Sequence, residues 1–287
     1  MALHLPILDK CNIMCNFCSA WGRGGGFALD YLKGQIDQDA TGHVQISGGD
    51  PMMKEHADLV AILRYCKAKG KIVEFQTNAT LVTQIPPAQL VEIIANVDYW
   101  NVNYSAHEPE LDFKVTAVRE AFAWREQGVR ELLRRGCTVR LTYIVHKVNA
   151  LYTADFVRHV KRDLPGVSWI QFSFVKAMGL ARGNDQVVPK YEEVAGPLNE
   201  AMALCVASGI KVFVDHIPVC FVEKFKDYHV DYQKMKNQQQ GIFLREKQKV
   251  ADCDTCSLKS CCPGPRVDYL DIYQGLGEVP KFEAEKA

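Results

Sequence analysis

Short apolar, β-branched runs alternate with longer amphipathic segments over most of this chain. In the longer segments the apolar residues repeat with a helical period, so that Val118, Phe122 and Val129, for example, fall roughly on one face. Helices are therefore predicted over Met53–Ala68, Pro87–Ala95, Lys114–Arg135, Ala154–Arg162 and Glu192–Ala207. The runs typical of strands are Leu3–Leu8, His43–Ile46, Ile72–Gln76, Tyr99–Tyr104, Thr138–Val145, Trp169–Val175 and Lys211–Val214.

This order of strands and helices predicts an α/β fold with a parallel sheet and right-handed crossovers. Six strand–helix units before residue 210 fit a partial (β/α)6 TIM-type barrel, in which chemistry belongs at the carboxyl ends of the strands. After Cys220 the pattern changes to a polar, basic stretch followed by a cysteine-rich segment. We therefore expect a barrel over residues 1–215 and a small cysteine-organised region over residues 216–287.

The charge of the chain is balanced, with 34 Lys and Arg against 34 Asp and Glu. Proteins that bind nucleic acid or membrane surfaces through a general basic excess are thereby disfavoured. The apolar runs are too short to span a bilayer. The amino-terminal residues lack a basic region followed by an apolar stretch and a cleavage site. We expect a cytoplasmic protein with no nucleic-acid and no membrane partner.

Eleven cysteines are a high number for such a chain, and they are clustered. Without an export signal, disulfides are disfavoured. Three cysteines fall within residues 11–18 and four within residues 253–262. Metal ligands must cluster in this way, whereas buried thiols have no reason to do so. Cys66, Cys137 and Cys205 lie inside helix or strand patterns and are interpreted as buried thiols.

The first group, Cys11, Cys15 and Cys18, has the spacing C-x3-C-x2-C directly after the first predicted strand. Thiolates are the usual ligands of iron–sulfur clusters, and three of them leave one iron of a [4Fe–4S] cube open. A zinc site would normally take a fourth cysteine or histidine nearby, and none stands in the expected place. Chance spacing in a cysteine-rich chain is the alternative interpretation.

The segment from Cys11 to Cys18, with Phe17 before the third cysteine, resembles the defining motif of radical S-adenosylmethionine (SAM) enzymes. In that family the open iron binds the methionyl end of SAM, the aromatic residue packs near the adenine, and reduction cleaves SAM to a 5′-deoxyadenosyl radical. The resemblance implies a SAM-binding [4Fe–4S] cluster on Cys11, Cys15 and Cys18. It also implies a one-electron reductant such as flavodoxin or ferredoxin.

The turn after the second predicted strand contains Gly48, Gly49 and Asp50, followed by Pro51. By itself this is an ordinary strand-to-helix turn, with glycines for unusual dihedrals, Asp as the N-cap and Pro at the first helical position. It is also similar to the family's Gly-Gly-Glu-Pro segment, which contacts the amine of SAM. Asp50 stands where Glu is commoner in the family, and that contact is made largely by backbone.

Polar residues end the next strands, where the resemblance implies SAM contacts at Thr77, Asn103 and Ser105. Alternation places Asn101, Asn103 and Ser105 on one face. Such inward polar residues either meet a polar ligand or bond one another or water. Arg140, on the fifth predicted strand, either contacts the carboxylate of SAM or forms a surface salt bridge.

The second cysteine group resembles the twitch or SPASM extension of radical SAM enzymes, with C-x2-C-x5-C-x-G spacing after a lone earlier cysteine. A full SPASM domain carries two clusters and needs more cysteines than this group offers. The resemblance therefore implies one auxiliary [4Fe–4S] cluster on Cys220, Cys253, Cys256 and Cys262, with Cys261 as the ambiguous neighbour. A structural zinc knuckle is the alternative.

These features predict a radical SAM enzyme of oxidoreductase type that abstracts hydrogen from a substrate. The auxiliary cluster would accept an electron or bind the substrate. The triplet begins at residue 11, leaving no room for a leader-binding domain before it, so we expect oxidation or cross-linking of a small metabolite. The alternatives are a maturase for a ribosomally made peptide and a non-catalytic iron–sulfur electron-transfer protein, which would not explain the open ligand position. No acid or base is assigned; the candidates are Tyr143, His146, Asp215 and His216.

Overall fold

The computed structural model of this chain describes residues 2–22, 24 and 27–280. At its centre lies a sheet of seven parallel strands that follow one another in chain order. The six predicted units are present, and a seventh strand continues the same sheet. The strands are β1 Leu3–Leu8, β2 His43–Gly48, β3 Ile72–Thr77, β4 Tyr99–Asn103, β5 Val139–Val145, β6 Trp169–Phe174 and β7 Val212–Asp215.

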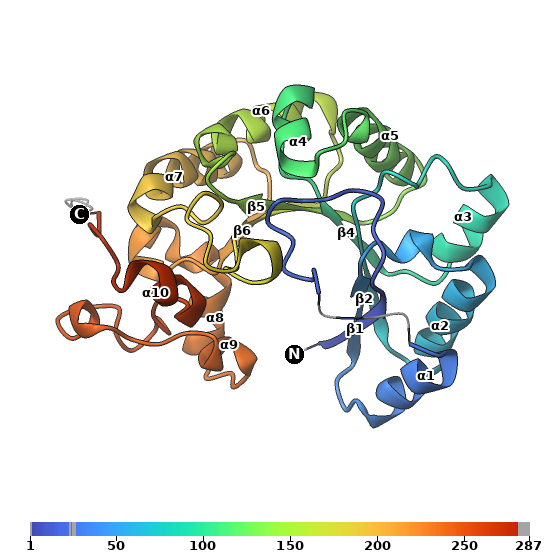
Figure 1. The fold of residues 1–287 in the computed structure, drawn as a ribbon, viewed down its shortest axis with the longest axis horizontal. Helices are drawn as coiled ribbons and strands as arrows, with labels where there is room; N and C mark the ends of the chain where they lie inside the picture. Colours follow the sequence, from blue (N-terminus) through green and yellow to red (C-terminus); the bar gives the residue numbers. More distant parts are fainter. Residues whose placement is uncertain (1, 23, 25–26, 281–287) are drawn as a thin grey trace.

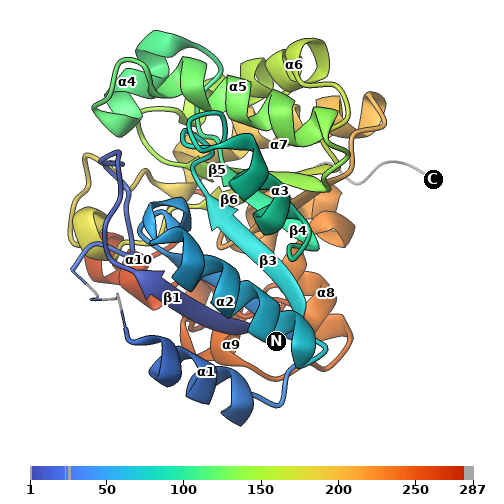
Figure 2. The same cartoon turned by 90° about the vertical axis from the view of Figure 1, so that its right-hand side faces the viewer.

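Helices cover the outer, convex side of the curved sheet (Figures 1 and 2). Among the described strands β1 and β7 are the two edges, so the barrel is incomplete and the predicted fold class is confirmed. None of the described helices is both long and apolar enough to cross a membrane. The helices are α1 Leu29–Gln38, α2 His56–Ala68, α3 Pro87–Ile94, α4 Pro109–Thr116, α5 Ala121–Arg134, α6 Thr153–Asp163, α7 Tyr191–Ala207, α8 Val230–Lys236, α9 Ile242–Arg245 and α10 Val267–Tyr273.

The two faces of the sheet differ because side chains alternate along each strand. The face under the helices is apolar and buried, with Phe75, Leu141 and Phe172 among its residues. The opposite, concave face is polar. Its residues pair in register from strand to strand, as in Gln45 with Glu74, Asn101 with Arg140, Thr142 with Gln171, and Ser173 with Asp215.

Glu74 is the centre of this polar face near the amino ends of the strands. Its buried carboxylate accepts hydrogen bonds from Tyr99 (2.6 Å), Asn101 (2.7 Å) and Arg140 (2.6 Å). Burial opposes ionisation of Glu74, but the hydrogen bond from His43, the charge of Arg140 and the hydrogen bonds from Tyr99 and Gln45 hold its pKa well below the usual range. Asn101 also accepts from Thr142 at 2.6 Å. Of the three inward polar residues on the fourth predicted strand, Asn101 therefore bonds to polar neighbours, which was one of the two alternatives.

The predicted helix over 114–135 is two helices. Ala117 has a φ of 58°, and its N–H bonds to the carbonyl of Phe113, which ends α4. A non-glycine residue rarely adopts this left-handed conformation, so nothing in the apolar period marks the break. Helix α1 was also not predicted, because only Leu32 and Ile36 are buried in an otherwise polar segment.

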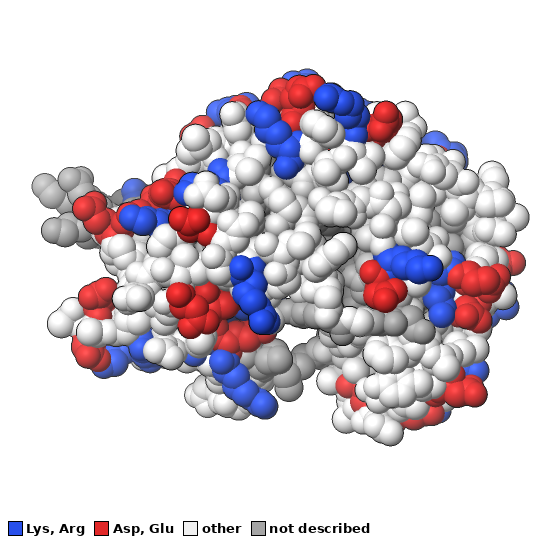
Figure 3. Space-filling view, viewed as in Figure 1, with Lys and Arg blue, Asp and Glu red and all other residues white. Residues whose placement is uncertain are grey.

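The residues after β7 pack against the edge of the sheet formed by β6 and β7 (Figure 1). Tyr269 of α10 stacks on Tyr191 of α7, with ring centroids 3.7 Å apart, and both rings are buried. Tyr269 and Leu276 share the buried core of the barrel. The division between residues 215 and 216 stays a prediction drawn from composition. On the face seen in Figure 3, charges of both signs are interspersed around a central hollow.

His146, directly after β5, makes the stability of this fold depend on pH. Its ring is fully buried, 5.1 Å from that of Phe17, and neither ring nitrogen has a hydrogen-bond partner among the described residues. Burial lowers the pKa of His146 from 6.5 to about 3. Between these two pKa values His146 is protonated in the unfolded chain but neutral in the folded chain. The free energy of unfolding therefore falls as the pH falls. We expect His146→Leu to reduce this loss by up to about 1.4 kcal/mol per pH unit.

The measurement is urea unfolding of the metal-free protein at about pH 7.5 and about pH 5, chosen to bracket the ordinary histidine pKa. His56→Leu is the control, because the His56 ring is partly exposed and paired with Glu92. Equal pH slopes for His146→Leu and the wild type would show that the buried ring is not the cause.

Candidate active site

The loop that carries the first three cysteines crosses the carboxyl ends of the strands (Figure 1). It is fixed by backbone hydrogen bonds from three directions. From β2, the N–H of Gly49 donates to Leu8 (2.6 Å) and that of Asp50 donates to Lys10 (2.8 Å). The remaining bonds tie the loop to α4 and to the segment after β6: Met14 N to Thr116 O (3.0 Å), Asn16 N to Val115 O (2.9 Å) and Leu180 N to Cys18 O (3.1 Å).

Gly48 and Gly49 permit this close approach of the loop to β2. Gly48 has a φ of 124°, in the region that favours glycine. A Cβ atom on Gly48 would collide with the carbonyl of Leu8, and one on Gly49 would collide with the carbonyl of Lys10. A side chain at either position would therefore displace the loop that places Cys11.

A cavity of about 280 Å³ opens beside this loop. Cys11, Cys15 and Cys18 all line it. Six of the eight predicted SAM contacts line it as well: Phe17, Gly48, Gly49, Asp50, Thr77 and Asn103. Residues far apart in the sequence thus meet at the edge of the sheet where this fold places chemistry.

Ser105 and Arg140, the other two predicted contacts, do not line this cavity. The Ser105 hydroxyl accepts from the N–H of Ile144 at 3.0 Å, and the residue is buried. Arg140 lies near the amino end of β5 and forms its salt bridge with Glu74. Ser105 thus bonds to β5, and Arg140 forms a salt bridge, which was the alternative for that residue; a SAM contact by either residue stays a prediction.

Asp50 caps a short 3-10 turn, Pro51–Met53, and not the following helix as predicted, since α2 begins at His56 with Glu55 as its N-cap. Asp50 is fully buried and accepts from the N–H groups of Met52 (3.0 Å) and Asn78 (2.8 Å) and from the Thr77 hydroxyl (2.9 Å). Burial raises the pKa of Asp50, although these donors oppose the shift. Because its oxygens are engaged within the protein, the backbone of this turn remains the part able to meet a ligand.

Two of the three thiols have pKa values above the ordinary range. Burial raises the pKa of Cys15 to about 12, and it also raises the pKa of Cys11, although the Cys11 side chain is partly exposed. Thiolates at such positions need adjacent positive charge, which bound iron provides. The amide of Asn78 lies 3.6 Å from the Cys11 sulfur, as a donor to it. In the described part of the chain no three Cys, His, Asp or Glu side chains surround a single-ion position; a cube instead takes each thiolate at a separate iron.

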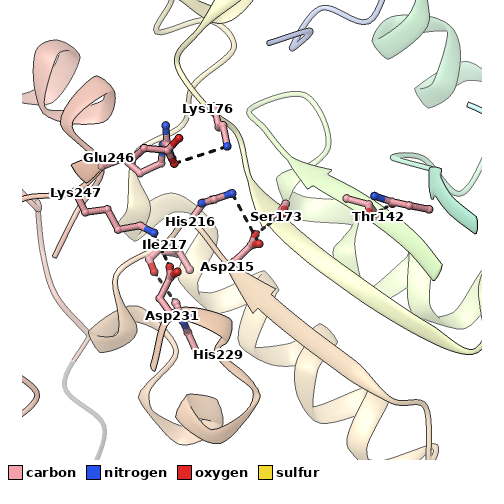
Figure 4. A network of polar contacts seen from close by, with 12 residues as sticks. Thr142, Ser173, Lys176, Asp215, His216, Ile217, His229, Asp231, Glu246 and Lys247 are labelled. Carbon is pink, nitrogen blue, oxygen red and sulfur yellow. Dashed lines mark hydrogen bonds and ion pairs between the residues drawn. The ribbon is translucent and has the colours of Figure 1, made fainter. Parts of the chain in front are cut away.

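A polar wall of the cavity comes from the carboxyl ends of β6 and β7 and the residues that follow them (Figure 4). His216 lines this wall with a φ of 64°, and its Nδ1 is buried without a partner among the described residues. Its Nε2 lies 3.8 Å from the Asp215 carboxylate, to which Ser173 donates. Lys176 lines the same wall, with its Nζ 3.8 Å from Glu246.

Burial and the neighbouring cation Lys176 hold the pKa of His216 well below its ordinary value, so the imidazole is neutral at pH 7. Behind it, Lys247 pairs with Asp231 at 2.6 Å, and the His229 Nε2 atom lies 2.7 Å from the Ile217 carbonyl (Figure 4). This buried layer fixes the segment after β7 and so holds His216 toward the cavity.

Comparison with known proteins decides the family. The family model "Radical SAM superfamily" matches residues 5–160, which include the cysteine loop and β1 to β5. The chain belongs to the radical SAM superfamily. Membership implies an enzyme that uses a [4Fe–4S] cluster and SAM. Among curated proteins, no sequence matches this radical SAM enzyme significantly.

Solved structures share the fold along nearly the whole chain. Streptococcus suis SuiB bound to S-adenosylmethionine is similar with a TM-score of 0.65 and 14% identity, over 94% of this chain and 74% of SuiB. The anSMEcpe protein with bound AdoMet has a TM-score of 0.65 and 12% identity, over 95% of this chain and 91% of that one. At this identity the likeness establishes the fold alone.

The second cysteine group of this radical SAM enzyme also surrounds a cavity, of about 490 Å³. Cys220, Cys253, Cys256 and Cys262 line it, whereas Cys261 does not. Cys262 is buried and accepts from the N–H of Gly264 at 3.4 Å. The Cys261 thiol instead points to the Leu258 carbonyl, at 3.5 Å. Burial raises the pKa of Cys220 to about 12, with the other three cavity cysteines adding to the shift.

Two further residues beside the cysteine loop were missed in the sequence. Arg125 of α5 and Asp112 of α4 form an ion pair in which both side chains are fully buried. The sequence does contain an indication of Arg125, because this residue falls between Phe122 and Val129 on the apolar face of its helix. A charged residue on such a face requires a buried partner, but Asp112 could not be identified from the helical period.

We expect Gly49→Ala to reduce the iron bound by the first cysteine group, because the added Cβ would displace the Lys10 carbonyl and with it Cys11. Gly34→Ala is the matched control, since a Cβ at Gly34 meets no atom within 4 Å. Both variants would be reconstituted anaerobically in a background that lacks Cys253, Cys256 and Cys262, and their iron would be counted. Full iron loading of Gly49→Ala would show that the close approach is not required.

Proposed function

We propose that this enzyme cleaves SAM reductively at the Cys11, Cys15 and Cys18 site and uses the 5′-deoxyadenosyl radical to take hydrogen from a small metabolite, oxidising or cross-linking it. The observation that carries the proposal is the convergence of the three thiols, Phe17 and the Gly48–Gly49 turn on one cavity. When bound there, the cluster supplies the electron for cleavage, and flavodoxin or ferredoxin is the class of reductant that would replenish it.

In this proposal each part of the site has a separate task. The cysteine loop holds the cluster. The turn at Gly48, Gly49 and Asp50 offers backbone to the methionyl end of SAM, Thr77 and Asn103 offer polar groups, and Phe17 packs at the adenine. A cytoplasmic location fits the proposal, because all eleven cysteines are free thiols and disulfides are rare in that compartment.

An auxiliary [4Fe–4S] cluster on Cys220, Cys253, Cys256 and Cys262 is the second part of the proposal. It is supported by the shared cavity of these four thiols and by the N–H groups that donate to them, from Leu258 to Cys256 (3.4 Å) and from Gly264 to Cys262 (3.4 Å). Such bonds stabilise thiolates. The cluster would accept an electron from the substrate or bind the substrate. In this reading residues 216–287 form a twitch- or SPASM-like region.

The substrate belongs, in our proposal, against the wall that contains Ser173, Lys176 and His216. These residues line the same cavity as the three cysteines. The Lys176 ammonium group can donate to an acceptor on the substrate. The unpartnered Nδ1 of the neutral His216 can accept from a donor on the substrate. A modified peptide is the alternative substrate, because similarity extends over 95% of this chain to anSMEcpe with bound AdoMet and a Kp18Cys peptide, at a TM-score of 0.63.

Cys261→Ala and Cys262→Ala form a matched pair that tests the auxiliary cluster. With four thiolates per closed cube, we expect Cys261→Ala to keep about eight irons per chain and Cys262→Ala to fall toward about four. The Cys262 variant should still produce 5′-deoxyadenosine, because the first cluster is independent of it. It should fail to complete turnover of a substrate.

The measurement is the iron and zinc content of the two anaerobically reconstituted variants, with 5′-deoxyadenosine assayed in parallel. Iron loss in Cys261→Ala alone would shift the ligand assignment by one residue. Unchanged iron in both variants, with zinc bound, would replace the auxiliary cluster by a structural zinc knuckle.

A further inference from the structure

Arg125 is a charged side chain inside the apolar packing of α4, α5 and the end of β3. Its guanidinium is fully buried, with its charge centre 5.5 Å from the centroid of the Tyr104 ring. Nη1 donates to the buried carboxylate of Asp112, and Nε donates to the carbonyl of Asn78 at 3.2 Å. The third nitrogen, Nη2, is buried and has no hydrogen-bond partner among the described residues.

The two partners of Arg125 both lie next to the cysteine loop. Asp112 belongs to α4, whose last carbonyls, at Val115 and Thr116, accept the N–H groups of Asn16 and Met14. Asn78 donates its side-chain amide to the sulfur of Cys11 at 3.6 Å. Arg125 therefore links two of the elements that fix the loop, and it brings a full positive charge to this place.

Arg125 is one hydrogen bond away from the residue that donates to a cysteine sulfur. Its Nε binds the carbonyl of Asn78, whose amide lies 3.6 Å from the Cys11 sulfur. The Asp112 carboxylate instead accepts from Arg125 and from the Thr116 hydroxyl of its own helix. The cation is thus the member of the pair that these contacts link to a cluster ligand.

We propose that Arg125 tunes the SAM-binding cluster: its charge, linked to the cysteine loop through Asn78, makes the cluster easier to reduce. The inference rests on the proposed function, because it requires a cluster on Cys11, Cys15 and Cys18. Arg125 is a positioning residue in this role, since it contacts the residues that hold the loop and does not line the SAM cavity.

The physical reason is charge. Reduction adds one negative charge to a cluster, and a cation in a water-poor interior stabilises the more negative state. Hydrogen bonds to the sulfurs and the net charge around them are among the factors that set the reduction potential of such clusters. A buried ion pair is weak evidence for stability, because an apolar pair of similar volume often stabilises as well. The arrangement of this pair therefore points to an electrostatic task.

The test is a redox titration of the first cluster, followed by the electron paramagnetic resonance signal of the reduced state. All variants would carry Cys253→Ala, Cys256→Ala and Cys262→Ala, so that only one cluster contributes. We expect Arg125→Met to shift the midpoint potential to more negative values and Asp112→Asn to shift it to more positive values. Arg125→Lys, which keeps the charge, should stay near the parent protein.

Arg130→Met is the matched control, because Arg130 lies on the same helix, is exposed and pairs only with Glu126 among the described residues. Its potential should be unchanged. Arg125→Met leaves Asp112 buried without its partner and so can impair folding. The double variant Arg125→Met with Asp112→Leu removes both charges, and we expect its potential to lie between those of Arg125→Met and the parent.

The outcomes separate the two proposals. Shifts of Arg125→Met and Asp112→Asn in the same direction, or no shift of the double variant when it is loaded with iron, would limit Arg125 to a structural role and overturn the inference. If the parent protein binds no four-iron cluster at the first cysteine group, the proposed function itself is overturned, and the inference falls with it. Opposite shifts with full iron loading support both.

Discussion

The site depends on how the backbone of residues 9–18 is held. This loop has no regular secondary structure, yet β2, α4 and the segment after β6 each bond to its backbone. Because backbone groups make these bonds, the three cysteine side chains are left available to a ligand. A cluster with three protein ligands needs the three sulfurs fixed relative to one another, and one with an open iron needs a cavity beside them. The same bonds meet both needs.

The polar concave face is the second constraint. A parallel sheet covered by helices is usually apolar on both faces, but this incomplete barrel carries polar residues inside. Near the amino ends of the strands these residues satisfy one another around Glu74. Toward the carboxyl ends, Asn103, Thr142, Ser173 and His216 line the cavity. Gln76 and Asn101 belong to both parts, because they bond to Glu74 and also line the cavity.

Much of this was predictable from the sequence, because it rests on local signals. Short apolar, β-branched runs located the strands, and the helical period located most of the helices. The spacing of Cys11, Cys15 and Cys18 identified the family, which the family model confirms. The Gly-Gly turn was recognised because glycine permits unusual dihedrals and because the segment resembles one in the family, whereas its close approach to the cysteine loop appeared only in the structure. The cavity gathers six of the eight predicted SAM contacts, although their role toward SAM stays a prediction.

The remainder depended on contacts over long distances in the sequence. Arg140 and Glu74 are 66 residues apart, so neither residue indicates its partner. The break at Ala117 requires a left-handed residue that no glycine marks, and that break places Val115 and Thr116 against the cysteine loop. Arg125 was visible as a charge on an apolar helix face, but its meaning required the positions of Asp112 and Asn78.

The most direct test of the account is the formation of 5′-deoxyadenosine from SAM and dithionite by the anaerobically reconstituted protein. Wild type would be compared with a variant in which Cys11, Cys15 and Cys18 are all replaced by Ala. The account predicts that the wild type forms 5′-deoxyadenosine and that the triple variant forms none, while it retains the iron of the auxiliary cluster. Continued formation of 5′-deoxyadenosine by the triple variant would contradict the assignment of the site.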